Sequence, residues 1–412
     1  MRKFLLTMLI ALVAISLMAP APAQAQGAPA PKKEIKDPAE YNSYVGATQQ
    51  SNPQAKISGL LDFLQRYPNS VVKEDALEHL MTAYQQTGDA AKAMEIVGRL
   101  LEVSPYNLRG LAVMAYSKRQ AALNGQDAIK NAADAEETGQ RGLKSLATAT
   151  KPEGMNDADW DKLKKQYGLV FNAAVGFGEL QKKNWAEAAK YLQLAVQADP
   201  TQFYDVYYLG VSYLQQTPIN PLGLFYVARA VNLSNSNADV VKFGRYYYGK
   251  YHGGLDGWDA LVAQAKDTLL PPEGFRITPA PTLADQAKAL VESKDPKLMS
   301  FAEWELILSA GEPPVADKVW NTIKGQSVEF AGQVISATRS TLLIAATVDA
   351  IEKNQPDVEV TMSAPLPLRL VPRAGSEIQV LAVPASYEPN PFVMKMSKGV
   401  LRQAAPRRSG RG

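Results

Sequence analysis

The chain contains no recognisable motif for nucleophilic or metal chemistry, and its carboxylates are scattered along the sequence, which cannot pair them. It has no cysteine and two histidines, His79 and His252, and neither has a second ligand at a metal-binding spacing. Hydrolase motifs of the G-x-S-x-G type and glycine-rich phosphate loops do not occur in the sequence. We therefore predict that the protein is not an enzyme and uses no metal or cofactor. Both histidines are interpreted as structural or solvated.

Two helical faces instead indicate a binding function. Opposite its packing stripe, one helix presents polar side chains, whereas the equivalent face of a later helix presents tyrosines. Tyrosine combines a large apolar area with a polar tip, which suits contact with a partner. The alternative is that these rings pack on a neighbouring helix or on the C-terminal domain. The candidate contact residues are Asp75, Glu78, Thr82, Gln85, Phe177, Tyr204, Tyr207 and Tyr208.

The elements that carry these faces are pairs of short amphipathic helices. In residues 74–107 the first helix has an apolar stripe, Gly88-Asp89 forms the turn, and Pro105 closes the unit. The stripe consists of Leu77, Leu80, Met81 and Tyr84, and the second helix contributes Ala93, Val97 and Leu100. This unit resembles the tetratricopeptide repeat family, although Met81 stands where the family prefers a small residue.

Two further units carry the same signature. The first has Asn172, Val175, Gly176, Ala188, Leu192, Ala195 and Pro200, and the second has Val206, Leu209, Gly210, Tyr213, Tyr226, Ala230 and Leu233. The last unit has Asn235 in place of the closing proline. With degenerate units on both sides and a loop at 151–162, the resemblance covers residues 38–270. It implies a helical solenoid whose concave groove, lined by the first helices, holds a peptide.

The N-terminal segment predicts export. Residues 1–25 combine Arg2 and Lys3 with an apolar run and an A-x-A site ending at Ala25, the pattern of a cleavable signal peptide. An uncleaved membrane anchor is the alternative. Residues 26–37 are predicted to be a flexible leader. Without a cysteine a lipoprotein anchor is excluded, and no later stretch can span a membrane, so we expect a periplasmic or secreted protein.

The charge balance argues against a nucleic-acid partner. The chain has 44 basic and 41 acidic residues, and loss of Arg2 and Lys3 with the signal peptide leaves 42 against 41. Arg402, Arg407, Arg408 and Arg411 supply much of the remaining positive charge, and residues 403–412 are predicted to be a disordered basic tail. We therefore expect a protein or peptide partner in the cell envelope rather than a nucleic acid.

The C-terminal third predicts a different architecture. Residues 271–282 contain four prolines and are interpreted as a linker, followed by a helical connector at 283–324 with a capping box at Ser300 and Glu303. Residues 325–402 alternate with period two in five short runs, which resembles an OB-like five-stranded barrel. A small open β-sandwich is the alternative. The fold class is thus a multidomain α+β protein.

The barrel is not expected to bind oligonucleotides or saccharides. Such binding needs stacking aromatics beside basic residues, and its strands offer Phe330 and Phe392 with few basic residues, chiefly Lys395 and Lys398. A structural or docking role is favoured, and Trp304 and Trp320 are interpreted as core.

The sequence leaves three hypotheses about the function of the protein. The first is a non-catalytic exported tetratricopeptide-type scaffold that binds a peptide segment or protein on its concave face. The second is a cell-envelope saccharide-binding or saccharide-processing factor with its site in the groove between the domains. The third is a purely structural repeat without a ligand.

Overall fold

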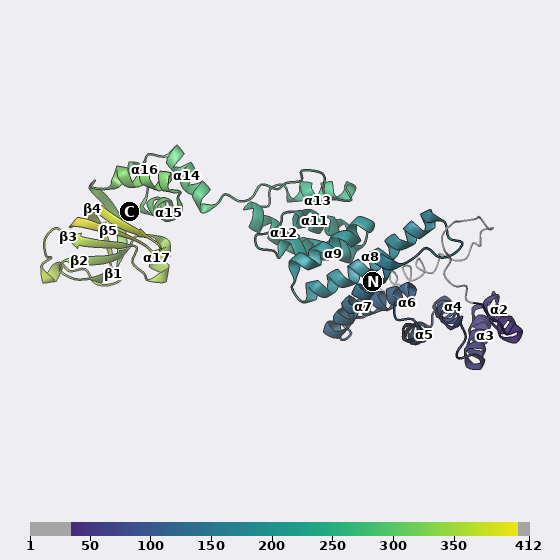
Figure 1. Cartoon of the computed structure of the whole chain (residues 1–412). Helices are drawn as coiled ribbons and strands as arrows, with labels where there is room; N and C mark the ends of the chain where they lie inside the picture. The colour runs from purple at the N-terminus through teal and green to yellow at the C-terminus, as the bar shows by residue number, and fades with distance from the viewer. Residues whose placement is uncertain (1–33, 403–412) are drawn as a thin grey trace, which may run out of the picture. The chain divides into compact units, whose positions relative to one another are not determined.

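The computed structural model describes residues 34–402. The chain forms two compact units that divide between Thr278 and Pro279, which lies in the segment interpreted as a linker. The first unit is helical, and the second combines short helices with a β-barrel (Figure 1). The predicted signal peptide, most of the predicted leader and the predicted basic tail lie outside the described residues. In the part of the chain from 34 to 402, no helix is long and apolar enough to cross a membrane.

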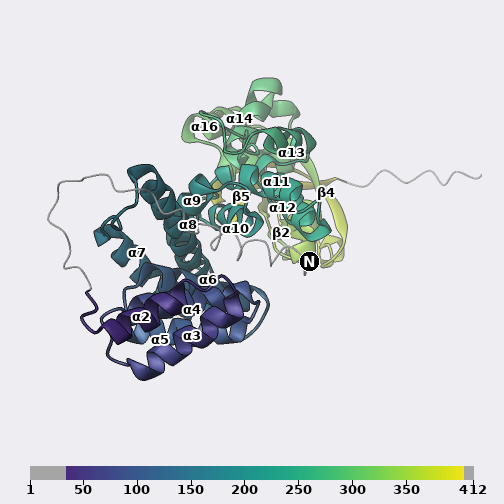
Figure 2. The same cartoon turned by 90° about the vertical axis from the view of Figure 1, so that its right-hand side faces the viewer.

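The first unit consists of helices that follow one another in pairs (Figures 1 and 2). Each helix from α2 to α10 packs on the next helix in the chain, α11 packs on α12, and α13 returns to pack on α11. The pairs are α2 (Pro38–Thr48) with α3 (Pro53–Arg66), α4 (Lys73–Gln86) with α5 (Ala90–Val103), α6 (Leu108–Leu123) with α7 (Ala128–Thr148), α8 (Asp157–Gln181) with α9 (Trp185–Ala198), α10 (Phe203–Leu214) with α11 (Leu222–Leu233), and α12 (Ala238–His252) with α13 (Trp258–Asp267).

Asparagine and aspartate side chains fix where many of these helices begin. Asn52, Asp89 and Asn107 each accept a hydrogen bond from a backbone N–H in the first turn of the helix that follows. Asn156 does the same for α8, so this helix begins at Asp157. The expectation of a loop through residue 162 was therefore wrong, because the capping residue had not been recognised.

Glycines allow two of the pairs to pack closely. A Cβ at Gly176 would lie 2.7 Å from Leu192 Cγ, and a Cβ at Gly210 would lie 2.7 Å from Val227 Cγ2. These contacts join α8 to α9 and α10 to α11. The corresponding position of α4 is Met81, whose side chain is fully buried. Different residues thus fill the same place in successive pairs, and the packing adapts to the volume available.

The second unit ends in a closed five-stranded barrel with the order β1-β2-β3-β5-β4. Strands β3 and β5 pair in parallel, and the other neighbours are antiparallel. The expectation of five strands is confirmed, and the alternative of an open sandwich was wrong because β1 pairs with β4 to close the sheet. The strands are β1 (Val328–Ala337), β2 (Thr341–Ala345), β3 (Val358–Met362), β4 (Glu377–Pro389) and β5 (Phe392–Arg402).

Short helices cover part of the barrel and complete its core. The capping box at Ser300 and Glu303 is confirmed at the start of α15. Trp304 is buried, as expected, and its Nε1 donates a hydrogen bond to the Pro296 carbonyl at 2.8 Å. Trp320 packs edge-on against Tyr387 of β4. The helical elements of this unit are α14 (Leu283–Ser293), η1 (Pro296–Leu298), α15 (Phe301–Ala310), α16 (Pro313–Ile323), α17 (Val348–Lys353) and η2 (Leu368–Leu370).

Candidate partner-binding surface

Helix α10 separates its apolar packing side from an aromatic side. Val206, Leu209 and Tyr213 are buried in the core of the first unit. Tyr204, Tyr207 and Tyr208 lie on the other side of the helix, as the helical spacing requires. The local sequence therefore places three adjacent tyrosines where they can meet rings from the neighbouring first helices.

The structure extends these tyrosines into a continuous series of ring contacts across α8, α10 and α12. Tyr208 lies 5.6 Å from Phe177 and 6.0 Å from Tyr204, measured between ring centroids. Tyr207 stacks on Phe203 at 5.8 Å and meets Phe243 edge-on at 5.8 Å. We call this series the aromatic face, and it comprises Phe177, Phe203, Tyr204, Tyr207, Tyr208, Phe243, Tyr246 and Tyr247.

Accessibility varies strongly along the aromatic face. Phe177 is only 3% exposed, and Tyr207 and Tyr208 are half-buried. By contrast, Tyr204 is 42% exposed and Tyr246 is 61% exposed. Burial raises the pKa of Tyr208 to about 12, with the nearby Arg119 acting in the opposite direction. The inner rings therefore serve packing, whereas the outer rings leave apolar area open to a partner.

The ring series extends beyond the residues chosen from sequence. Phe243 and Tyr247 of α12 lie 4.7 Å apart, and Tyr247 accepts a hydrogen bond from the Gln215 amide at 2.7 Å. The ammonium group of Lys250 lies 5.9 Å from the Tyr247 ring centroid. These α12 residues were not among the candidate contact residues chosen from the sequence. Their spacing at i and i+4 with Phe243 was the signal that could have placed them on this face.

A buried ion pair lies beneath the aromatic face. Arg119 of α6 donates to the carboxylate of Asp205 of α10, and both side chains are buried. The Arg119 guanidinium also lies over the Phe177 ring, 5.8 Å from its centroid. Burial raises the pKa of Asp205, and the charge of Arg119 opposes that rise. The ion pair links two helices far apart in the chain and fixes the edge of α10 that carries the tyrosines.

The polar set on α4 is largely engaged within the protein. The amide of Asn107, at the start of α6, donates to Glu78 Oε1 at 2.5 Å and to Glu74 Oε1 at 2.9 Å. The Thr82 hydroxyl donates to the Glu78 carbonyl of its own helix at 2.8 Å. Burial raises the pKa of Glu78, while the Asn107 hydrogen bond and the Arg109 charge lower it. Glu78 is thus a constrained structural carboxylate more than a free surface charge.

The remaining members of the polar set lie close to α2 or on the partly exposed side of α4. Asp75 is half-buried and, after burial itself, is the next cause that raises the pKa of Tyr44 to about 12. Gln85 is half-buried near the end of the helix. Glu78 contacts Asn107 and Arg109 at the start of α6, whereas the α10 tyrosines contact rings of α8 and α12. The structure therefore presents two separate surfaces.

The titratable groups offer one cluster that sequence reasoning missed. Glu136 of α7 accepts hydrogen bonds from Lys182 and Gln140, and Lys182 also contacts Glu179 at 3.3 Å. Burial raises the pKa of Glu136. Glu136 lies on α7 and Lys182 lies at the end of the next helix, α8, 46 positions away, so no local motif could reveal the cluster. Within the described residues, no group of three or more acidic or histidine side chains is arranged to hold a metal ion.

The two histidines occupy separate places. His79 packs 6.5 Å from the Tyr44 ring, and burial lowers its pKa. His252 Nδ1 lies 2.7 Å from the carbonyl oxygen of Thr278. That contact helps to hold the end of the proline-rich segment against the last helices of the first unit.

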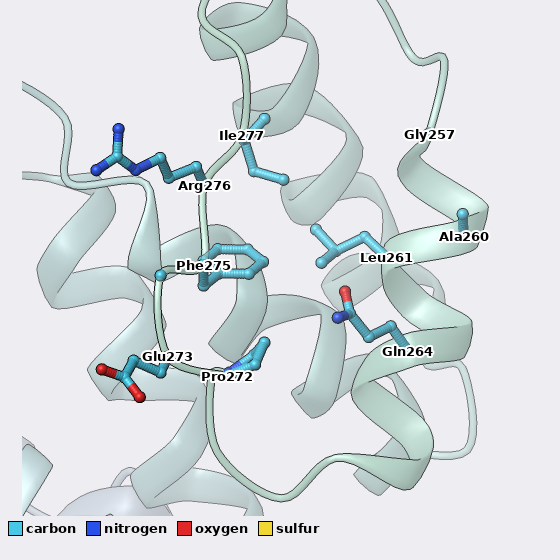
Figure 3. Close-up of a pocket in the computed structure, with 10 residues that line it drawn as sticks. Gly257, Ala260, Leu261, Gln264, Pro272, Glu273, Phe275, Arg276 and Ile277 are labelled. Atoms are coloured by element: carbon cyan, nitrogen blue, oxygen red, sulfur yellow. The ribbon is translucent and has the colours of Figure 1, made fainter.

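The same segment frames a shallow cavity at the end of the helical unit (Figure 3). Residues 272–277 run beside α13 and enclose a volume of about 360 Å³ with Leu261 and Gln264. Phe275 turns inward and meets Phe225 edge-on at 5.5 Å. The Glu273 and Arg276 side chains point away from α13 (Figure 3). The inward ring makes this part of the predicted linker a packed edge of the helical unit.

The barrel does not present a stacking platform made of its own phenylalanines. Phe301 of α15 lies 5.7 Å from Phe330 and 6.2 Å from Phe392, so the two strand rings are engaged by the covering helix. Phe330 is buried. The open aromatic area described above therefore lies on the helical unit.

Comparison with known proteins adds no family to this description. A scan against protein-family models found no match to the chain, and a search of curated proteins found none either.

Proposed function

We propose that the protein is an exported, non-catalytic scaffold of tetratricopeptide type, which binds a peptide segment or protein partner across the aromatic face. The observation that carries this proposal is the unbroken series of rings on α8, α10 and α12, whose outer members remain exposed. Rigid aromatic side chains supply contact area at a low cost in conformational entropy. In the proposed solenoid this face is the concave one, and the N-terminal signal directs the protein to the periplasm or exterior.

The supporting geometry favours an extended or helical peptide over a small molecule. The aromatic face spans three helices and is not an enclosed cavity, whereas small-molecule sites are usually concave pockets that bury most of the ligand. Peptide recognition commonly uses a few anchors spread along a surface. The OB-like barrel is proposed to cap the helical unit or to dock a second partner.

The first experiment compares capture of partners by the full chain and by two variants. Tyr204→Ala combined with Tyr207→Ala removes one outer and one inner ring of the aromatic face, and Tyr106→Ala removes an exposed tyrosine elsewhere. Pull-down from envelope extract followed by mass spectrometry should recover a protein partner with the parent chain and with Tyr106→Ala. The double variant should lose it by at least about tenfold, as expected for loss of interface anchors.

The second experiment separates the peptide partner from a saccharide. Aromatic faces also stack on sugar rings, so the same proteins are tested for binding to soluble peptidoglycan fragments. Binding of the fragments that depends on Tyr204 and Tyr207, without a captured protein, would favour the saccharide factor. Retention of every captured protein by the double variant and by Glu78→Ala would reject a partner site on either face.

A further inference from the structure

One end of the barrel gathers three segments that are distant in sequence. Thr341 pairs with Thr361, Gln333 pairs with Glu377, and Gln379 pairs with Arg402. The register therefore brings together the turn between β1 and β2, the connection between β3 and β4, and the end of β5. Helix α17 follows β2 and precedes β3, which places it at the opposite end of the barrel.

The connection between β3 and β4, residues 363–376, projects leucines outward from a braced backbone. Leu368 is 80% exposed and Leu370 is 54% exposed. Leu366 N donates to the Arg339 carbonyl at 2.7 Å, and Arg339 Nε donates to the Leu366 carbonyl at 3.0 Å. Leu370 N donates to the Pro367 carbonyl at 2.8 Å, closing the η2 turn. The exposed leucines are therefore held in place by the fold, since their neighbours are hydrogen-bonded and proline-rich.

The same end is strongly basic. Arg339, Arg369, Arg373 and Arg402 lie in these segments, and residues 338–340 and 363–376 contain no aspartate or glutamate. Glu377, the first residue of β4, is the adjacent acidic residue. Within residues 34–402, none of the four arginines forms an ion pair with a carboxylate.

We propose that this end of the barrel docks on a bilayer surface that contains anionic phospholipids. Leu368 and Leu370 enter the interfacial region, and the surrounding arginines contact lipid phosphates. Two leucines on a projecting turn suit a deformable lipid surface, whereas a stable protein interface needs roughly 1,000 Å² of complementary area. The positive charge without paired carboxylates supplies the complementarity to anionic headgroups. This proposal does not depend on the partner of the aromatic face.

The test measures cosedimentation of the full chain with vesicles at low and at physiological salt. One vesicle preparation contains phosphatidylethanolamine and phosphatidylglycerol, and the other contains phosphatidylcholine alone. The parent chain should bind the anionic vesicles more strongly, and added salt should weaken that binding. Equal, salt-insensitive binding to both vesicle types would overturn the proposal.

Variants assign the binding to this end of the barrel. Leu368→Asp with Leu370→Asp should lower the partition coefficient by at least about tenfold, because two apolar anchors are lost. Arg369→Glu with Arg373→Glu should lower it by at least about 25-fold at low salt, since each basic residue near the surface contributes about fivefold.

The matched control is Val348→Asp, because Val348 is 70% exposed on α17 at the other end of the barrel. It should bind as the parent chain does. All proteins share residues 1–25, so any contribution of that segment is common to them, and circular dichroism checks that each is folded. If both loop variants bind anionic vesicles like Val348→Asp, the proposal is wrong. It is also wrong if the parent binds a soluble acidic polypeptide but no vesicle.

Discussion

The outward faces of α4 and α10 occupy comparable places in their helix pairs but differ in how completely the protein satisfies them. On α4 the carboxylate of Glu78 is held by Asn107 and lies 4.0 Å from Arg109. On α10 the inner rings pack on α8 and α12, while Tyr204 keeps an exposed edge. The polar face is closed by hydrogen bonds from α6, whereas the aromatic face remains open.

The difference shows that a helix face becomes a candidate binding site only where the neighbouring helices leave its side chains exposed. A carboxylate accepts only a few directed hydrogen bonds, and a side chain at the start of the following helix pair can supply them. A series of rings is not satisfied by a fixed number of contacts. Each additional ring covers part of its neighbour and also exposes apolar surface of its own. Four predictions test this comparison.

The largest effect is expected at the ion pair beneath the aromatic face. Arg119→Met leaves the Asp205 carboxylate buried without its partner, so the free energy of unfolding of the helical unit should fall by about 3–5 kcal/mol. Denaturant unfolding followed by far-UV circular dichroism measures this. The double variant Arg119→Met with Asp205→Leu should recover most of the loss. Equal stability of Arg119→Met and the parent chain would show that the aromatic face does not depend on this ion pair.

The second-largest loss of stability is expected when Asn107, which donates to the carboxylates of α4, is replaced. Asn107→Ala removes the cap at Gly110 N and both amide donors to Glu74 and Glu78, and we expect a loss of about 2–3 kcal/mol. Asn107→Asp is the matched control, because it keeps a capping oxygen but adds a third carboxylate. Its destabilisation should be larger at neutral pH than in acid. A neutral-pH stability equal to that of the parent chain would contradict the proposed closure of this face.

Removing an inner ring and removing an outer ring of the aromatic face should change the free energy of unfolding by different amounts. Tyr208→Ala removes a half-buried ring that packs on Phe177, so we expect a loss of about 2 kcal/mol. Tyr204→Ala removes a ring with an exposed edge and should change the free energy of unfolding by less than about 0.5 kcal/mol. Thermal unfolding of both variants checks the contrast. Similar losses at both positions would mean that the face is packed throughout and offers no open area.

The smallest effect is the pH dependence attached to Glu78. Burial raises the pKa of Glu78, so its contribution to stability is complete below the unfolded-state pKa and is lost as the pH rises through the folded-state pKa. Glu78→Gln should match the parent chain within about 0.5 kcal/mol at about pH 4 and should be the more stable protein at pH 7. Denaturant unfolding at the two pH values is the measurement. A constant difference between them would argue that the pKa of Glu78 is the same in the folded and the unfolded state.

Much of the architecture could be predicted from residue spacing. The alternation of Val328–Ala337 identified a strand, and the capping pattern at Ser300 and Glu303 identified the start of α15. Such features depend on neighbours within a few residues, which a sequence displays directly. The start of α8 was missed, because residues 151–162 were interpreted as one loop and Asn156 was not recognised as the capping residue.

The candidate site was predictable only in part. The spacing of Tyr204, Tyr207 and Tyr208 placed them on one side of a helix, but their burial depended on Phe177 and Phe243 from other helices. The same reasoning from helical spacing assigned Asp75, Glu78, Thr82 and Gln85 to one face of α4. That Asn107 engages Glu78 could not be foreseen, because a side-chain hydrogen bond between separate helices leaves no local pattern.

By itself the sequence determined the periodicity of each element, the residues that begin and end it, and the side of each helix on which rings or carboxylates lie. These properties follow from the fixed geometry of helices and strands, whose side-chain directions repeat every few residues. Only the tertiary structure decided that Arg119 pairs with Asp205, that β1 closes on β4, and that Leu368 and Leu370 stay exposed. Contacts between distant segments depend on how whole elements pack, and that packing is set by the sum of many small interactions.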